Sequence, residues 1–61
     1  MKRYLLFGGA DYESAGGMED FINDYEVILY AKDDGYSELE KFGCDWVHIY
    51  DTDKRKIVWE K

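Results

Sequence analysis

Cys44 and His48 are the two side chains best suited to nucleophilic catalysis in this sequence. A cysteine nucleophile requires a base within hydrogen-bond reach and a third group that orients the base. The segment around them alternates like a strand, and residues four apart on a strand lie roughly 13 Å apart. We therefore expect no catalytic pair, with His48 as an aromatic on a sheet surface and Cys44 as a small buried residue. An enzyme with His48 as its base is the weakest hypothesis, and the chain is predicted not to be an enzyme.

Carboxylates stand close together in three places: Glu19–Asp20, Asp33–Asp34, and Asp51 with Asp53. Two carboxylates that cleave a glycosidic bond must face each other across a cleft. A chain this short has little room to form the walls of such a cleft. Asp51 and Asp53 resemble the start of a calcium loop, but Arg55 stands at the next alternate position. We therefore predict that Asp51 and Asp53 form a turn.

A glycine-rich loop, residues 8–17, begins with Gly8–Gly9 and ends with Gly16–Gly17. Phosphate-binding loops follow their glycines with Lys and Ser or Thr, or use three spaced glycines to open a helix, and neither pattern is present. The loop carries Asp11 and Glu13, which would repel a phosphate. The glycines are therefore predicted to serve the backbone turns, and no cofactor is expected.

Composition sets the class of protein. The chain has 61 residues, a formal net charge of −6 and 18% aromatic residues, which indicate one small folded domain over residues 1–61 rather than a disordered acidic tail. No apolar run approaches the ~20 residues of a membrane span. The net negative charge opposes nucleic-acid binding in spite of the basic cluster Lys54–Lys56, so no nucleic-acid partner is expected. One cysteine fits a reducing compartment and allows no internal disulfide, so association with another chain is the expected support.

Hydrophobic periodicity predicts an α+β fold of the order ββαββ. The expected strands cover residues 2–8, 18–25, 45–51 and 56–60, with a hairpin between the last two. Together they make a four-stranded, mainly antiparallel sheet with one helix on one face.

Residues 27–42 are the segment with two interpretations, because Val27–Tyr30 alone is typical of a strand. We favour a helix, since Ile28, Ala31, Leu39 and Phe42 share a stripe at helical spacing. Gly35 is expected to break or bend this helix. Ser37 would then cap the second piece, and Gly43 would end it.

A single helix leaves one sheet face without cover. In residues 45–51 the side chains of Trp46, His48 and Tyr50 share one face, and Val47 and Ile49 share the other. Ile57 and Trp59 are expected on one side of the last strand. An apolar face of this size predicts an interface with another molecule, and the alternative is that the 8–17 loop folds over it.

Charge is also unevenly distributed along the chain. Acidic residues run without a basic residue from Asp11 to Glu26, and the cluster Lys54–Lys56 lies near the other end. If the fold separates them, an acidic side could steer the protein onto a basic partner. From the exposed aromatics and the acidic tract we predict a set of protein-contact residues: Asp11, Tyr12, Glu13, Glu19, Asp20, Trp46, Tyr50 and Trp59.

Short motifs across the chain resemble a known group of proteins. They are Tyr4–Gly9, Tyr12, Gly16–Gly17, Asp20–Phe21, Asp45–Trp46, His48–Asp51 and Ile57–Val58. With these motifs the chain resembles short uncharacterised proteins of tailed bacteriophages and prophages. The resemblance implies an accessory protein in the cytoplasm of the bacterial host cell, and it brings no established catalytic residues.

Two hypotheses about function follow. The first is a non-enzymatic protein, a homodimer, that binds and blocks a host protein or an anti-phage defence protein, as many small acidic phage proteins do. The alternative is a sponge for a nucleotide or other small ligand, built from the 8–17 loop and the aromatics Tyr12, Tyr50 and Trp59, with Lys54 or Arg55 at a phosphate.

Overall fold

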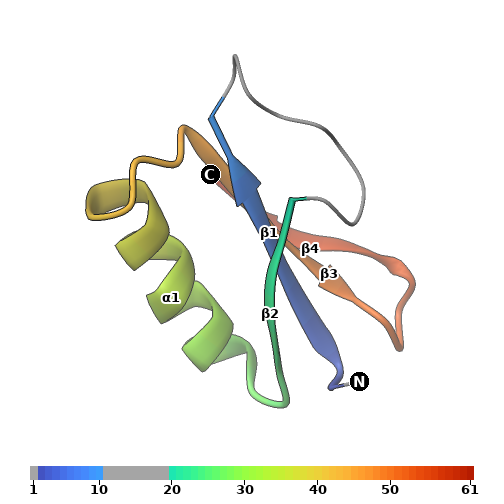
Figure 1. The fold of residues 1–61 in the computed structure, drawn as a ribbon. Helices are drawn as coiled ribbons and strands as arrows, with labels where there is room; N and C mark the ends of the chain where they lie inside the picture. The colour runs from blue at the N-terminus through green and yellow to red at the C-terminus, as the bar shows by residue number, and fades with distance from the viewer. Residues whose placement is uncertain (1, 11–19) are drawn as a thin grey trace.

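The computed structural model describes residues 2–10 and 20–61, which form one sheet and one helix (Figure 1). The elements in chain order are β1 (Tyr4–Gly9), β2 (Phe21–Tyr25), α1 (Ile28–Glu40), β3 (Trp46–Asp51) and β4 (Lys56–Glu60). The sheet order is β2-β1-β3-β4, and every neighbouring pair is antiparallel. The predicted α+β fold with the order ββαββ is confirmed.

The predicted ranges differ from the observed ones mainly at their ends. β1 begins at Tyr4 and continues through both glycines, because Gly8 and Gly9 pair with Val47 and Trp46 of β3. β2 begins at Phe21 rather than at residue 18, and residues 18 and 19 lie outside the described ranges. β3 begins one residue later than predicted, and β4 has its predicted bounds.

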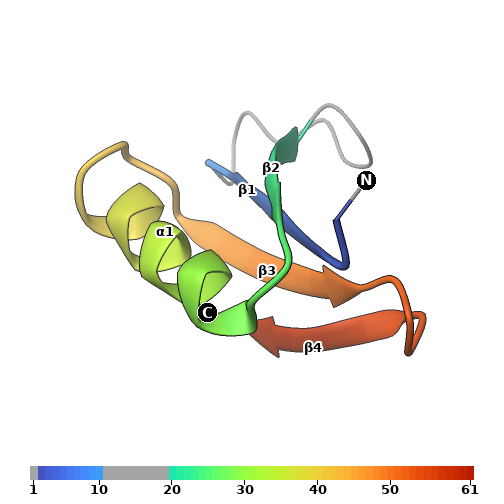
Figure 2. The ribbon, with the colours of Figure 1, turned by 90° about the horizontal axis from the view of Figure 1, so that it is seen from below.

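The core lies between α1 and one face of the sheet. Figure 2, which views the molecule from below, shows α1 on one side of the strands. Leu6, Val47 and Ile49 are fully buried from the sheet side, and Ala31 is fully buried from the helix side. Ile28 and Leu39 extend this contact along α1. Burial at alternate positions of β3 confirms the predicted division of its two faces.

Gly35 is expected from the sequence to break or bend the helix. Instead, α1 runs through Gly35 without interruption. Gly35 is buried, and a Cβ atom placed on it would lie 3.0 Å from Cζ3 of Trp59. The absence of a side chain therefore leaves room for the Trp59 ring, which reaches from β4 to the surface of α1. Ser37 lies inside this helix rather than capping a second one, and Val27 is the residue before its first turn.

The end of α1 changes the place of Phe42. The helix ends at Glu40, and Gly43 adopts a φ of +80°, which a glycine tolerates without strain. Phe42 is 72% exposed. Its predicted place on the buried stripe is therefore wrong, because the chain leaves the helical path before this residue.

A buried carboxylate ties the first strand to the last turn. Asp51 is 1% exposed, and its two oxygens accept hydrogen bonds of 3.0 Å from Nε and Nη2 of Arg3. The backbone N–H groups of Asp53 and Lys54 also donate to Asp51. The predicted turn is confirmed, and the guanidinium holds the pKa of Asp51 down to about 2.

No helix in the described ranges is long and apolar enough to cross a membrane, since α1 has only 13 residues.

We expect Gly35→Ala to destabilise the wild-type protein. The gain in helix propensity is about 1 kcal/mol, whereas overpacking against Trp59 costs about 1–3 kcal/mol. In a Trp59→Phe background the smaller ring leaves room, and the same substitution should raise the free energy of unfolding. Urea denaturation of the four proteins measures both effects, and an equal change in the two backgrounds would show that Trp59 is not the obstacle.

Replacing Asp51 should have an effect that depends on pH. The pKa of Asp51 is lower in the folded state than its usual 3.8, so its stabilisation is present above about pH 4 and is lost as the pH falls through 2. Asp51→Asn should therefore lower the urea midpoint at pH 7, and the gap to the wild type should narrow between pH 4 and pH 2.

The control for this experiment is Asp53→Asn. The Asp53 side chain also lies near Arg3, at 3.3 Å, but it is 70% exposed, so its loss should change the midpoint little. Equal effects of the two substitutions would contradict the special role of Asp51.

Candidate interaction surface

The sheet face opposite α1 carries a row of aromatic side chains. Phe7 on β1 lies directly opposite Phe21 on β2 and His48 on β3, so the three share this face. Trp46 lies two residues from His48 on the same strand and has the same orientation. We call Phe7, Phe21, Trp46 and His48 the aromatic row.

The rings of the aromatic row touch one another across three strands. The centroids of Phe7 and Phe21 are 5.7 Å apart in an edge-on arrangement, and those of Phe7 and His48 are 5.3 Å apart. Trp46 stacks on His48 at 5.0 Å. All four side chains are of intermediate burial, so part of each residue reaches the surface.

His48 is therefore a sheet-surface aromatic, as predicted. Desolvation among the neighbouring rings lowers its pKa, and the negative charges of Glu60 and Asp20 partly oppose this shift. At neutral pH the imidazole is uncharged and contributes to the apolar character of the row.

Leu5, Tyr50 and Ile57 continue this face beside the row. Tyr50 lies opposite Leu5 of β1 and Ile57 of β4. Leu5 is 7% exposed and Ile57 is 47% exposed, so the face changes from covered to open toward β4.

Trp59 lies on the helix side of the sheet, and its predicted sharing of a face with Ile57 is wrong. A register shift between Ile49 and Tyr50 pairs Trp59 with buried Ile49, whereas Ile57 is paired with Tyr50. Trp59 packs edge-on against Tyr36 of α1, with ring centroids 5.4 Å apart. Tyr50 and Trp59 therefore cannot hold one nucleobase between them.

The predicted contact residues are only partly brought together. Trp46 and Tyr50 share the face of the aromatic row, and Asp20 lies just before β2, close enough to influence the charge on His48. Trp59 is on the other face. Asp11, Tyr12, Glu13 and Glu19 lie outside the described residues.

The fold also separates charge between the two edges of the sheet. Asp24 belongs to β2 at one edge, and Glu26 follows that strand. Lys56 begins β4 at the other edge, after the exposed Lys54 and Arg55. In the described residues the fold therefore separates the acidic tract from the basic cluster Lys54–Lys56, as an acidic side of the protein requires.

Cys44 and His48 are not arranged as a catalytic pair. Cys44 packs against the core on the helix side, whereas the ring contacts of His48 are with Phe7 and Trp46 on the opposite face. Burial raises the pKa of the Cys44 thiol, and the charges of Glu38 and Asp45 add to this. Over residues 2–10 and 20–61 no three His, Cys, Asp or Glu side chains gather as a metal site would require.

Sequence reasoning missed Phe7 and Phe21 as members of the interaction surface. Alternation placed Leu5 and Phe7 on one face of the first strand, but it did not give the pairing of β1 with β2. That pairing includes a register shift between Leu6 and Phe7, which brings Phe21 opposite Phe7. The signal available in the sequence was an aromatic residue in each of these strands.

The comparisons with known proteins give one family. A family model described as "Bacteriophage T4 protein Y07C" matches residues 4–61, which is almost the whole chain. No curated protein and no solved structure matches. The predicted resemblance to short phage proteins is confirmed.

The aromatic surroundings of His48 predict a loss of stability in mild acid. Because its pKa in the folded protein lies below the usual 6.5, the unfolded chain binds the proton more readily, and stability falls as the pH drops through 6.5. His48→Gln removes the only histidine of the chain. Urea midpoints at pH 7.5 and pH 5 should differ less in this variant than in the wild type, and an equal or larger difference would contradict the prediction.

Proposed function

Since the chain belongs to the family described as bacteriophage T4 protein Y07C, we propose that it is a phage accessory protein that binds and blocks a host or anti-phage defence protein. It is not an enzyme in this proposal. It acts in the bacterial cytoplasm, and the active form is a homodimer.

The observation that carries the proposal is the aromatic row on the sheet face opposite α1. A domain of this size buries only about 60% of its unfolded surface, and an aromatic face that stays partly exposed is a typical contact site. Aromatic side chains, Trp and Tyr above all, provide much of the binding energy in protein interfaces. The row offers Trp46, with Tyr50 beside it, as anchors of this kind.

The acidic edge supports the choice of a protein partner. Asp24 and Glu26 lie on the side of β2, and the net charge of the chain is −6. Such a field accelerates association with a basic protein surface and opposes binding to nucleic acid.

Replacing an aromatic anchor should abolish binding without unfolding the protein. We expect Trp46→Ala and Tyr50→Ala each to weaken the complex with the target by at least about 30-fold, as hot-spot truncations of about 2 kcal/mol do. The matched control is Tyr30→Ala, because Tyr30 is 64% exposed on α1, away from the row.

Affinity capture from bacterial lysate with quantitative mass spectrometry identifies the target, and the purified target then gives the dissociation constants. Wild-type protein and Tyr30→Ala should also raise the plating efficiency of a sensitive phage on a host that carries the defence, whereas Trp46→Ala should not. Equal binding by all variants would reject the row as the contact surface. Sedimentation that shows only monomer at every concentration would reject the homodimer.

A further inference from the structure

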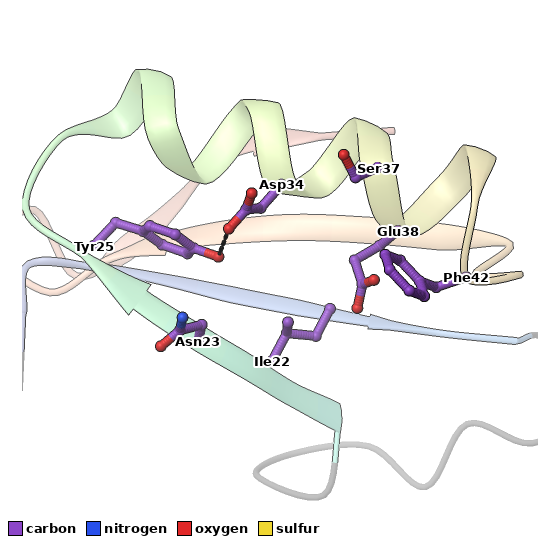
Figure 3. Close-up of a pocket in the computed structure, with 7 residues that line it drawn as sticks. All are labelled: Ile22, Asn23, Tyr25, Asp34, Ser37, Glu38 and Phe42. Carbon is purple, nitrogen blue, oxygen red and sulfur yellow. Dashed lines mark hydrogen bonds between the residues drawn. The ribbon is translucent and has the colours of Figure 1, made fainter.

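A groove separates α1 from the edge strand β2 on the helix side of the sheet (Figure 3). Its volume is about 230 Å³, several times the ~30 Å³ of one water molecule, so it has room for a long side chain. The lining residues are Ile22, Asn23, Tyr25, Asp34, Ser37, Glu38 and Phe42. This groove lies on the opposite side of the sheet from the aromatic row.

One end of the groove is closed by a hydrogen bond. The hydroxyl of Tyr25 donates to Oδ2 of Asp34 at 2.5 Å, and this contact joins β2 to α1. Burial raises the pKa of Tyr25, and the bond to Asp34 raises it further, so the phenol keeps its proton. The hydrogen bond between Tyr25 and Asp34 therefore closes this end of the groove.

Glu38 and Phe42 form the other end, four residues apart in the chain, and Figure 3 shows their side chains next to each other. Glu38 is half-buried, and over residues 2–10 and 20–61 no ion pair or hydrogen bond of its carboxylate is found. None of the described lining residues is a Lys, Arg or His. A half-buried carboxylate without an ion-pair partner is an unfilled position for a positive group.

Phe42 provides the second feature of this end. Its side chain is 72% exposed, although it is large and apolar. A planar cation stacks on an aromatic face, and a neighbouring carboxylate can then accept two of its N–H groups. Ile22 reaches into the groove from β2 and offers an apolar contact to the methylene chain behind such a cation.

We propose that this groove receives an arginine side chain from a basic segment of the partner protein. The guanidinium stacks on Phe42 and donates to Glu38, and the methylene chain packs on Ile22. Arginine fits better than lysine because only its guanidinium is planar and binds a carboxylate through two parallel hydrogen bonds. The inference rests on the proposed function, because the arginine is taken to belong to the basic surface of the partner protein that the acidic side attracts.

The test uses a synthetic peptide, acetyl-Arg-Ile-Arg-Ile-Arg-amide, titrated into the ¹⁵N-labelled full chain. We expect amide shifts concentrated at Ile22, Glu38 and Phe42, and at least a tenfold weaker affinity in Glu38→Gln and in Phe42→Ala. The control Glu40→Gln makes the same charge change on an exposed position of the same helix, outside the groove lining, and should weaken binding less than twofold. The peptide in which Gln replaces each Arg should not bind, and the one in which Lys replaces each Arg should bind more weakly.

Three results would overturn the inference: no saturable shifts with the arginine peptide, shifts centred away from the groove, or equal weakening by Glu38→Gln and Glu40→Gln. The last result would show attraction to the net charge alone. These failures leave the proposed function intact if Trp46→Ala still abolishes binding to the captured target. If instead no target is captured while the peptide binds the groove as expected, the proposed function fails and the groove stands as an arginine site.

Discussion

Close contact between α1 and the sheet at two small residues is the constraint on which the rest of the structure depends. Ala31 and Gly35 let the helix pack closely over β1 and β3, and the side chains of Leu6 from β1 and Trp59 from β4 lie against Gly35. The helix therefore covers the sheet face that carries Leu6, Val47 and Ile49. Over residues 2–10 and 20–61 α1 is the one helix, and the aromatic row is left on the other face of the sheet.

The order of strands places the acidic and the basic parts of the sequence at opposite edges of the sheet. β2 and β4 are far apart in the chain and lie at opposite ends of the sheet. The ion pair with Arg3 neutralises the buried carboxylate of Asp51 at the β3–β4 turn. The exposed Lys54 and Lys56 then give this end of the sheet a positive charge. The groove between α1 and β2 is lined by the acidic residues Asp34 and Glu38, and none of its described lining residues is a cation.

The protein thus presents two surfaces of different chemistry. The aromatic row is broad and is formed by rings that contact one another, which suits the burial of a flat apolar patch. The groove at Glu38 and Phe42 is narrow and acidic, which suits a single protruding cation. The two surfaces lie on opposite sides of the sheet.

The sequence by itself determined the order of the elements and the two faces of β3, because alternation of Val47 and Ile49 with Trp46, His48 and Tyr50 depends only on strand geometry. It also determined the family, through motifs spread over nearly the whole chain. Only the tertiary structure decided that Gly35 is a packing contact rather than a bend, that Phe42 is exposed, and that Ile57 and Trp59 lie on different faces. The physical reason is that close approach, helix ends and register shifts depend on residues distant in the chain, and local periodicity carries no information about them.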